Sequence, residues 1–396
     1  MTTRAPARPG DPLADVDTPA LLLDLRTFEA NVAAMQAWCD GQGVTVRPHA
    51  KSHKCAAIAA YQMGRGAVGV CAQKVSEAEA LVHAGVSDVL VSNQIVGVAK
   101  ARRLAALAKL ATIGVCVDHS VQIEQLSTAA ALFDVTLNVL VEIEVGQGRC
   151  GVLPGAPALA LAKQVDAAPG LQLAGLQAYH GGAQHFREPD ARRAAVDHAA
   201  QAVRQTTALL AEAGLDAPTI AGAGTGTFYL EGAAALWTEV QPGSYAFMDA
   251  DYARNTAAPG DHPQGQHALF MHTTVMSRAK DGLAVLDAGH KALPIDSGMP
   301  LVWGDGSVRY SGPTDEHGCL RPANSGDAPV PSLSAANASP LATNALPELG
   351  DNVLLVPAHC DPTVNQHDWI VVMDDLHGPN PRVVQVWPVT ARGCYA

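Results

Sequence analysis

Two histidines and two lysines stand close together in the segment VRPHAKSHKC, residues 46–55. The segment opens with a short β-branched run, so we expect His49 and Lys51 in the loop that follows a strand. A lysine that is desolvated in such a loop loses its proton more readily, and its neutral amine can form a Schiff base with an aldehyde. The alternative is a solvated basic loop without a chemical role, which is the usual reading of an arbitrary lysine.

Glycines and hydroxyl side chains later in the chain could bind a phosphate group. They occur in GAGTGTFY, residues 222–229, and in QPGSY, residues 241–245. Glycines after strands let backbone N–H groups approach a phosphate, and the hydroxyls of Thr225 and Ser244 can add hydrogen bonds. A Gly-Thr-Gly by itself is usually only a turn. Its place near the end of a series of βα units favours the phosphate interpretation.

A third candidate is VPAHCDPTVNQHD, residues 356–368, where a histidine and an aspartate stand two positions apart. On an extended strand His359 and Asp361 would point to one side and Cys360 to the other, so an imidazole and a carboxylate could share a cation. The carboxylate favours Mn²⁺ or Mg²⁺ over Zn²⁺. Two ligands do not complete a coordination shell, so either water and substrate complete it or no metal binds.

The elements that must position these groups form a repeating pattern. From about residue 26 to 245, short β-branched runs alternate with Ala- and Leu-rich segments of helical period, which is typical of βα units around a parallel sheet. The candidate strands are 44–48, 66–70, 88–92, 112–118, 136–143, 171–179, 219–224 and 238–243. Eight strands predict a closed (β/α)8 barrel of the TIM type, with its chemistry in the loops after the strands. Reactive side chains do follow the predicted strands: His49, Lys51, Gln73, Arg149, Tyr179 and His180.

After residue 260 the pattern changes to alternating apolar runs separated by turn signals, which predicts a C-terminal β domain. The segment 322–349 is rich in Pro, Ala, Ser and Asn and is expected to form a mobile surface loop. A polar cluster, Asp315 to His317 in TDEHG, either reaches the same pocket as the other polar groups or forms only a turn.

Composition excludes several classes of function. The chain has 396 residues, of which 48% are hydrophobic and 16% charged, so it can bury a large core. Its apolar runs are of strand length, which excludes a membrane span, and its N-terminus lacks the apolar stretch of a secretory signal, so a cytoplasmic location is expected. The eight cysteines contain no CxxC pair, which argues against a disulfide framework or a zinc ribbon. A net charge of −12 without a basic stripe excludes nucleic acid as a ligand.

Several of these segments together resemble one protein family. The segments are PGDPLADVDTPALLLDL, RPHAKSHKC, CAQKVSEAEA, IEVGQGRCGV, LQAYHGG, GAGTGT, VQPGSYAFMDAD, DEHG and HCDPT. In combination they resemble the D-threonine aldolases, a family within the alanine racemase-like group of pyridoxal phosphate (PLP) enzymes. D-3-Hydroxyaspartate aldolases are close relatives of that family, and D-serine dehydratases are more distant ones.

The resemblance implies a fold-type III PLP enzyme that forms a homodimer. Its PLP-binding barrel would span residues 26–255, and a C-terminal β domain with the metal ligands would span 256–396. The leading residues 1–25 would join the β domain through a strand near 20–25.

The resemblance also implies roles for individual residues. Lys51 would carry PLP, and His359 and Asp361 would hold a divalent cation. Arg149 and His185 would lie close to the reacting substrate. The residues around the PLP ring or phosphate would be Gln73, Tyr179, Thr225, Gly226, Gly243, Ser244 and Tyr245.

Two features depart from the pattern of related enzymes. Alanine racemases have an arginine two residues before the glycine that follows the last strand, and this chain has Gln241, so the PLP ring nitrogen would be held differently. The insertion at 322–349 is longer than in the aldolases.

The implied reaction is the cleavage of a β-hydroxy-D-amino acid to glycine and an aldehyde, with the cation on the β-hydroxyl group and a coordinated water or His185 removing its proton. The alternatives are a D-3-hydroxyaspartate aldolase, a D-serine or 3-hydroxyaspartate dehydratase, a racemase, a non-catalytic PLP-binding protein, and a barrel metallohydrolase without PLP. Dehydratases usually have a His and Cys ligand pair, so the His and Asp pair favours an aldolase. A metallohydrolase would have a paired His-x-His after the first strand, which this chain lacks.

Overall fold

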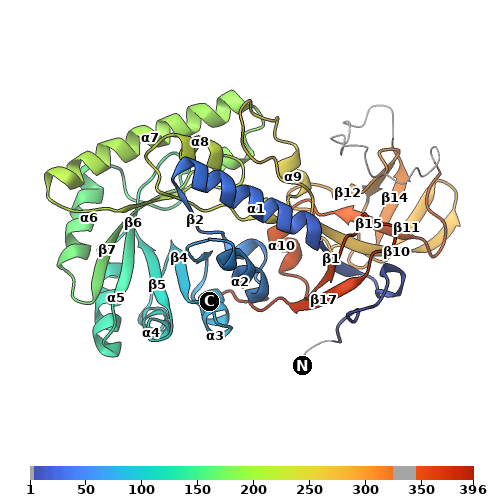
Figure 1. Ribbon diagram of the computed structural model, residues 1–396, viewed down its shortest axis with the longest axis horizontal. Helices are drawn as coiled ribbons and strands as arrows, with labels where there is room; N and C mark the ends of the chain where they lie inside the picture. Colours follow the sequence, from blue (N-terminus) through green and yellow to red (C-terminus); the bar gives the residue numbers. More distant parts are fainter. Residues whose placement is uncertain (1–3, 324–344) are drawn as a thin grey trace. The chain divides into compact units, whose positions relative to one another are not determined.

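The structure is a computed structural model that describes residues 4–323 and 345–396 (Figure 1). The chain divides into two compact units. The first, which we call the β unit, contains Met1–Val32, Ser244–Arg254 and Gln264–Arg392. The second, the barrel unit, contains Ala33–Gly243, Asn255–Pro263 and Gly393–Ala396.

Eight parallel strands form the barrel, in the order β2-β9-β8-β7-β6-β5-β4-β3. Their bounds are β2 Thr45–Val46, β3 Val70–Ala72, β4 Asp88–Gln94, β5 Thr112–Val117, β6 Leu137–Glu142, β7 Leu171–Ala178, β8 Thr219–Gly222 and β9 Glu239–Val240. The first and last strands of this order are joined by backbone hydrogen bonds, from Val68 N to Val46 O (3.1 Å) and from Cys71 N to Pro48 O (2.8 Å). The predicted barrel is therefore confirmed.

One predicted strand was misplaced. The sequence pattern predicted a strand at 66–70, but β3 begins at Val70. Gly66 has a φ of 116°, a backbone conformation outside the range of strands, so the chain is still turning at this point.

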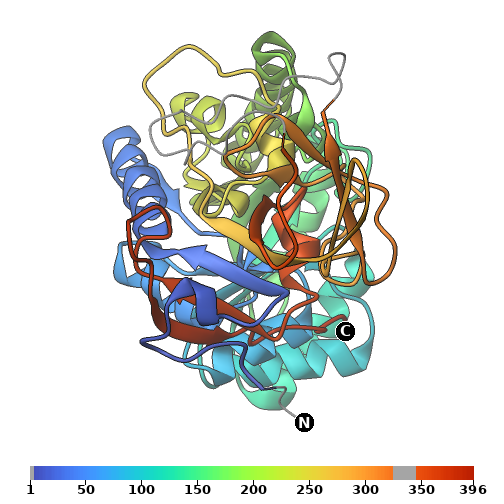
Figure 2. The ribbon, with the colours of Figure 1, turned by 90° about the vertical axis from the view of Figure 1, so that its right-hand side faces the viewer.

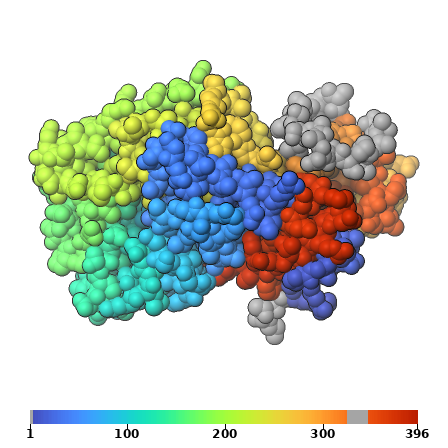
Figure 3. Space-filling model, in the orientation of Figure 1, coloured from blue at the N-terminus to red at the C-terminus, as the bar shows by residue number. Residues whose placement is uncertain are grey.

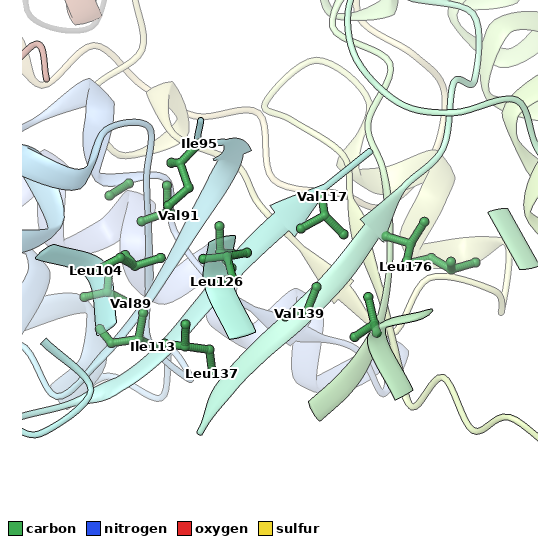
Figure 4. Close-up of a cluster of buried hydrophobic side chains, with 14 of the residues drawn as sticks. Val89, Val91, Ile95, Leu104, Ile113, Val117, Leu126, Leu137, Val139 and Leu176 are labelled. Atoms are coloured by element: carbon green, nitrogen blue, oxygen red, sulfur yellow. The ribbon is translucent and has the colours of Figure 1, made fainter. Parts of the chain in front are cut away.

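Helices pack on the outside of the barrel strands (Figure 1). Their bounds are α2 Ala56–Gly64, α3 Val75–His83, α4 Val98–Leu107, α5 Ser120–Phe133, α6 Ala156–Ala167, α7 Pro189–Glu212 and α8 Phe228–Ala233. Alternate residues of each strand face them: Val89 and Val91 of β4 belong to the core between strands and helices, whereas Leu90 belongs to a cluster inside the barrel. Figure 4 shows part of the outer core, where Val, Ile and Leu side chains of the strands meet Leu104 of α4 and Leu126 of α5.

Helix α1, Leu25–Gln42, begins in the β unit and ends in the barrel unit. Its buried residues Phe28, Val32, Met35 and Cys39 recur at helical spacing and give it one apolar face. Its opposite side lies on the molecular surface, where Figure 3 shows it in blue. Packing of this apolar face stabilises the helix.

The described part of the β unit contains a nine-stranded sheet with the central order β13-β14-β11-β10-β1-β16-β17, and β15 pairs with β10 and β12. The strands are β1 Ala20–Asp24, β10 Leu269–Lys280, β11 Leu283–Leu286, β12 Leu301–Val302, β13 Val308–Ser311, β14 Gly318–Pro322, β15 Asn352–Val356, β16 Trp369–Met373 and β17 Val383–Pro388. The N-terminal strand β1 pairs antiparallel with β10 and parallel with β16. Figure 2 looks onto this unit.

Short helices carry several of the candidate residues. They are η1 Leu13–Asp15, η2 Ala50–Ser52, η3 Gly182–His185, η4 Ser244–Ala246, α9 Ala250–Ala253 and α10 Cys360–Val364. Across the described residues, the structure contains no helix whose length and apolar character would let it cross a membrane.

The structure decides the alternatives left open for the TDEHG cluster but does not test the loop predicted at 322–349. The TDEHG cluster is an exposed turn, closed by a hydrogen bond from Thr314 N to His317 O (2.8 Å), and Glu316 pairs with Lys291 at the surface. The predicted mobile loop at 322–349 lies largely outside the described residues, because 324–344 are not described.

Candidate functional site

The two lysines of the VRPHAKSHKC loop have different surroundings. Lys54 is 7% exposed, and its ammonium group forms an ion pair with the carboxylate of Glu77, which is 4% exposed. Lys51 is only half-buried and lies in η2, directly after β2 and Pro48. The ion pair with Glu77 engages the Lys54 amino group, so this group is not available to an aldehyde. Lys51 is therefore the better candidate for a Schiff base.

The loop that carries Lys51 is tied to the ends of two other strands. Nε2 of His49 lies 2.9 Å from Nε2 of Gln73, which follows β3, and 3.1 Å from Oγ of Ser92 in β4. The carboxylate of Glu77, besides pairing with Lys54, accepts a hydrogen bond from the Gln73 backbone N–H (2.7 Å). The loops after β2 and β3 and the end of β4 are thus held as one polar network.

Arg149 and Tyr179 come together at the ends of β6 and β7. The guanidinium carbon of Arg149 lies 5.9 Å from the centroid of the Tyr179 ring, in the range of a cation–π contact. The loop of Arg149 is shaped by Glu144, whose carboxylate accepts the N–H groups of Gly146 (2.5 Å) and Gly148 (2.9 Å). Arg149 is exposed and Tyr179 is half-buried, so the pair lies at the mouth of the barrel.

The two histidines after β7 differ in their surroundings. His180 is buried, its Nδ1 accepts the Ala183 N–H (3.2 Å), and burial lowers its pKa, so it is a neutral residue that closes the turn. His185 is exposed at the end of η3. Of the two, His185 has the accessibility that a proton-transfer group requires.

The glycine-rich loop after β8 places Thr225 half-buried and Gly226 buried. Gly226 donates its N–H to Oε1 of Gln184 (2.9 Å), and the N–H groups of Thr227 and Phe228 bond to Gly224 O. Gly243 follows β9, and a Cβ atom there would lie 3.2 Å from the carbonyl oxygen of His49. The loop after β9 therefore packs closely on the loop that carries Lys51.

Gln241, the residue that departs from the alanine racemase pattern, is buried in the barrel. Its amide Nε2 donates to Glu239 (3.0 Å) and its Oε1 accepts from Gln177 (2.9 Å). The neutral amide is therefore held in one orientation by residues of β7 and β9. An arginine here would place a second positive charge in a network that Arg47 already neutralises through Glu239 (2.9 Å).

In the β unit, His359 and Asp361 lie side by side, with 3.8 Å between Nε2 and a carboxylate oxygen. Nδ1 of His359 lies 2.9 Å from a carboxylate oxygen of Asp249, a fully buried residue 110 positions away in sequence. A carboxylate can only accept, so Nδ1 carries the proton and Nε2 presents its lone pair on the side of Asp361. This carboxylate–histidine arrangement is the one that supports metal-binding histidines. The two side chains fit a divalent cation.

The local backbone of this pair was predicted wrongly. Residues 359–361 do not form an extended strand: only His359 is extended, with φ −143° and ψ 131°, and helix α10 begins at Cys360. Pro362 in the first turn of the helix and a hydrogen bond from the Thr363 hydroxyl to His359 O (2.7 Å) explain this start. The predicted proximity of the two side chains arises at a helix N-terminus.

Cys360 lies close to the same groups, and Asp249, His359 and Cys360 could themselves hold a metal ion. Its thiol donates to the Ser244 hydroxyl in η4 (3.2 Å) and is buried, and burial raises its pKa well above the usual range. A protonated thiol is a poor ligand. Asp361, half-buried and acidic, is the better partner for His359. Tyr245 is buried next to Ser244 in η4.

Sequence reasoning missed three supporting residues: Glu77, Asp249 and Gln184. Glu77 pairs with Lys54 at a separation of 23 positions, Asp249 contacts His359 at a separation of 110, and Gln184 contacts Gly226 at a separation of 42, so no local spacing indicates these pairings. For Glu77 the sequence does carry a local signal, but for another role: it stands at the third position of helix α3, where its carboxylate accepts the Lys74 backbone N–H (3.2 Å). This common use of glutamate at a helix start hides its ion pair with Lys54.

A closed parallel barrel with a lysine after its first strand, combined with a mainly antiparallel β unit, defines the alanine racemase-like class of fold. Residues 23–251 match the family model "Alanine racemase, N-terminal domain", and residues 268–373 match "Putative serine dehydratase domain". The chain belongs to the D-threonine aldolase family within this class, as its relatives show.

The relatives match the chain over nearly its whole length. A D-threonine aldolase from Arthrobacter sp. is 44% identical over 389 residues, covering 98% of this chain and 96% of the relative. A 3-hydroxy-D-aspartate aldolase from Paracoccus denitrificans (strain Pd 1222) is 41% identical over 393 residues, covering 98% and 95%. The crystal structure of a D-threonine aldolase from Filomicrobium marinum is 52% identical, with a TM-score of 0.92 and coverage of 99% and 100%.

Proposed function

We propose that this protein is a carbon–carbon lyase that cleaves β-hydroxy-D-amino acids such as D-threonine to glycine and an aldehyde, with PLP on Lys51 and a divalent cation on His359 and Asp361. The observation that carries the proposal is the half-buried Lys51 after the first barrel strand, in a chain 44% identical to a D-threonine aldolase. The Lys54–Glu77 ion pair leaves Lys51 as the one lysine of this loop suited to the role.

The barrel unit offers a donor set that fits PLP. The Lys51 amine would bind its aldehyde carbon, and Tyr179 and Gln73 would lie beside the ring. The Thr225 hydroxyl would bind the phosphate, and Gly226 and Gly243 would line the phosphate site. Ser244 and Tyr245 would also lie around the PLP ring or phosphate, as the resemblance implies. PLP supplies an electron sink for the bond that breaks at the α carbon. The chain's part is to hold the substrate so that this bond is the one in reacting position.

His359 Nε2 and Asp361 would hold the cation, with Asp249 fixing the imidazole. A carboxylate and an imidazole without thiolate favour Mn²⁺ or Mg²⁺ over Zn²⁺. The cation supplies Lewis acidity at the β-hydroxyl oxygen.

Two exposed residues of the barrel mouth would act on the substrate. The Arg149 guanidinium can form a bidentate pair with the substrate carboxylate. The exposed His185 imidazole can accept the β-hydroxyl proton. An arginine would also suit the second carboxylate of 3-hydroxy-D-aspartate, so we hold that compound as a second candidate substrate, in keeping with the 41% identical relative.

On the resemblance, we also propose a homodimer in the cytoplasm, with domain limits at 1–25, 26–255 and 256–396. All eight cysteines are free thiols, which is compatible with a reducing compartment.

The test is product analysis of the purified protein with D-threonine, PLP and Mn²⁺, beside a Lys51→Ala variant and a sample treated with EDTA. Glycine and acetaldehyde from the untreated wild type alone would support the aldolase and both cofactor roles. Formation of 2-oxobutyrate and ammonia would make the protein a dehydratase, and D-to-L conversion would make it a racemase. Full activity of Lys51→Ala would refute the role of that lysine.

A further inference from the structure

Gln184 joins the two barrel-mouth loops that contain Thr225 and His185. It belongs to η3, one residue before His185, and is 0% exposed. Its Oε1 accepts the N–H of Gly226 (2.9 Å), and its Nε2 donates to the hydroxyl of Thr227 (2.8 Å). A single buried side chain thus bonds to two consecutive residues of the glycine-rich loop after β8.

The hydrogen bonds of this contact run in one direction and end on a buried carboxyl group. A backbone N–H can only donate, so the oxygen of the Gln184 amide must face Gly226 and its nitrogen must face Thr227. The Thr227 hydroxyl accepts that N–H and donates its own proton to Oε1 of Glu231 (2.8 Å). Glu231 is 2% exposed and Thr227 is 0% exposed. Such an aligned, buried chain is cooperative and holds each member in one orientation.

The glycines of this loop are required by Gln184. A Cβ atom at Gly224 would lie 2.6 Å from Oε1 of Gln184, and one at Gly226 would lie 2.5 Å from its carbonyl oxygen. Distances below 3.0 Å are not found for real Cβ atoms. Both glycines of the Gly-Thr-Gly therefore have a packing reason that is independent of any phosphate.

The main chain of Gln184 is held as well. Its carbonyl oxygen accepts a hydrogen bond from Nδ2 of Asn255 (2.9 Å), and the side-chain oxygen of Asn255 accepts one from Arg187 (2.7 Å). Arg192, which is 2% exposed, donates to the carbonyl oxygens of Phe186 (2.6 Å) and Arg187 (2.9 Å). The turn before and after His185 is thereby fixed from both ends.

We propose that Gln184 is a positioning residue, which through Thr227 and Glu231 sets the glycine-rich loop in the conformation that receives the PLP phosphate. The proposal deepens the proposed function and rests on it. Because the Gly226 N–H is already bonded to Gln184, this loop would contact the phosphate chiefly through Thr225, whose position depends on the bonded residues on either side. A loop that is ordered before binding loses less conformational entropy when the cofactor binds.

The test uses Thr227→Val and Gln184→Met, each of which keeps the approximate size of the side chain and removes the chain of hydrogen bonds. Apoprotein is titrated with PLP and separately with pyridoxal, which lacks the phosphate, and binding is followed by absorbance. We expect PLP to bind about 10-fold more weakly or worse to each variant. Pyridoxal should bind as it does to wild type, and Thr227→Ser should restore PLP affinity.

Thr206→Val is the matched control. Thr206 is another fully buried threonine that accepts a glycine N–H, from Gly155 (2.9 Å), and it contacts neither of the two loops. Its substitution should leave PLP affinity unchanged. The melting temperature of each apoprotein shows whether a change in affinity follows from lost stability, and if Gln184→Met does not fold, Thr227→Val decides the question.

The outcomes distinguish failure of the Gln184 role from failure of the proposed PLP-dependent function. Wild type that binds PLP, together with a Thr227→Val variant of equal PLP affinity, would overturn the role of Gln184 and leave the proposed function intact. Equal loss of affinity for PLP and pyridoxal would also overturn it, because the effect would then not concern the phosphate. Wild type that binds no PLP would overturn the proposed function and this inference with it.

Discussion

The loop of Lys51 in the barrel unit and the pair of His359 and Asp361 in the β unit both bring reactive groups together within a few residues of sequence. They differ in how those groups are supported. The Lys51 loop is held by a network of neighbouring strand ends, in which Gln73, Glu77 and Ser92 all take part. In the pair of His359 and Asp361, a remote carboxylate, that of Asp249, contacts the imidazole.

Because of this difference, substitutions in the two regions should have different effects. A network spreads its support over several hydrogen bonds, so the loss of one bond leaves the others in place. The Asp249 carboxylate, in contrast, bonds directly to the His359 ring, so its loss acts directly on that imidazole. We therefore expect substitutions near Lys51 to act mainly on stability and a substitution of Asp249 to act mainly on metal binding.

The largest expected difference is between the two lysines of one loop. Lys51→Ala should lower aldolase activity by about 10³-fold or more, because no amine remains for the Schiff base. Lys54→Met should keep the PLP absorbance band but lower the free energy of unfolding by about 3 kcal/mol, because it leaves the buried Glu77 carboxylate without its cation. Urea unfolding and absorbance spectra measure both effects. Loss of the band in Lys54→Met and its survival in Lys51→Ala would reverse the roles of the two lysines.

A buried carboxyl group makes the stability of the barrel unit fall as the pH rises from about 4.5 to about 7. Burial raises the pKa of Glu231 from 4.5 to about 7. The folded state thus binds this proton more tightly, and its contribution, about 3 kcal/mol, is complete below pH 4.5 and is lost as the pH rises to about 7. Glu231→Gln cannot ionise, so its unfolding free energy should fall less than that of wild type between pH 5 and about 8. Parallel curves for the two proteins would contradict this expectation.

A buried histidine gives the β unit the opposite sensitivity. His272 is 0% exposed, neither ring nitrogen has a hydrogen-bond partner in the structure's described portion, and burial lowers its pKa to about 4. The unfolded state binds this proton more tightly, so stability falls as the pH drops from 6.5 to about 4, again by about 3 kcal/mol. His272→Leu should flatten this acid limb in urea unfolding series. An unchanged acid limb would show that other groups cause it.

The smallest expected effect concerns Asp249. Asp249→Asn keeps the shape of the side chain but removes the charge that supports His359, so Mn²⁺ should bind about 10- to 100-fold more weakly. Asp251→Asn is the control, because Asp251 is a buried aspartate in the adjoining helix α9 that pairs with Arg254 instead. Calorimetric titration of each apoprotein with Mn²⁺ measures the affinities. Equal affinities of wild type and Asp249→Asn would remove Asp249 from the metal site.

Much of the fold could be predicted from the sequence because its signals are local. The barrel strands are β-branched runs between helical segments, and alternating apolar residues after residue 260 predict the β unit. The two errors of the prediction lie where a glycine or a proline favours a backbone conformation other than that of a strand. Gly66 turns the chain where a strand was predicted, and Pro362 starts a helix where His359 and Asp361 were expected on a strand.

The sequence by itself determined which reactive groups this protein has and which of them stand together in the chain: Lys51 with His49, the Gly-Thr-Gly, and His359 with Asp361. Only the tertiary structure decided how those groups are held and protonated. It pairs Lys54 with Glu77, and it places Nδ1 of His359 against the carboxylate of Asp249. The physical reason is distance: a pattern within a few residues records local geometry, whereas charge pairing and burial depend on which remote segments the fold brings into contact.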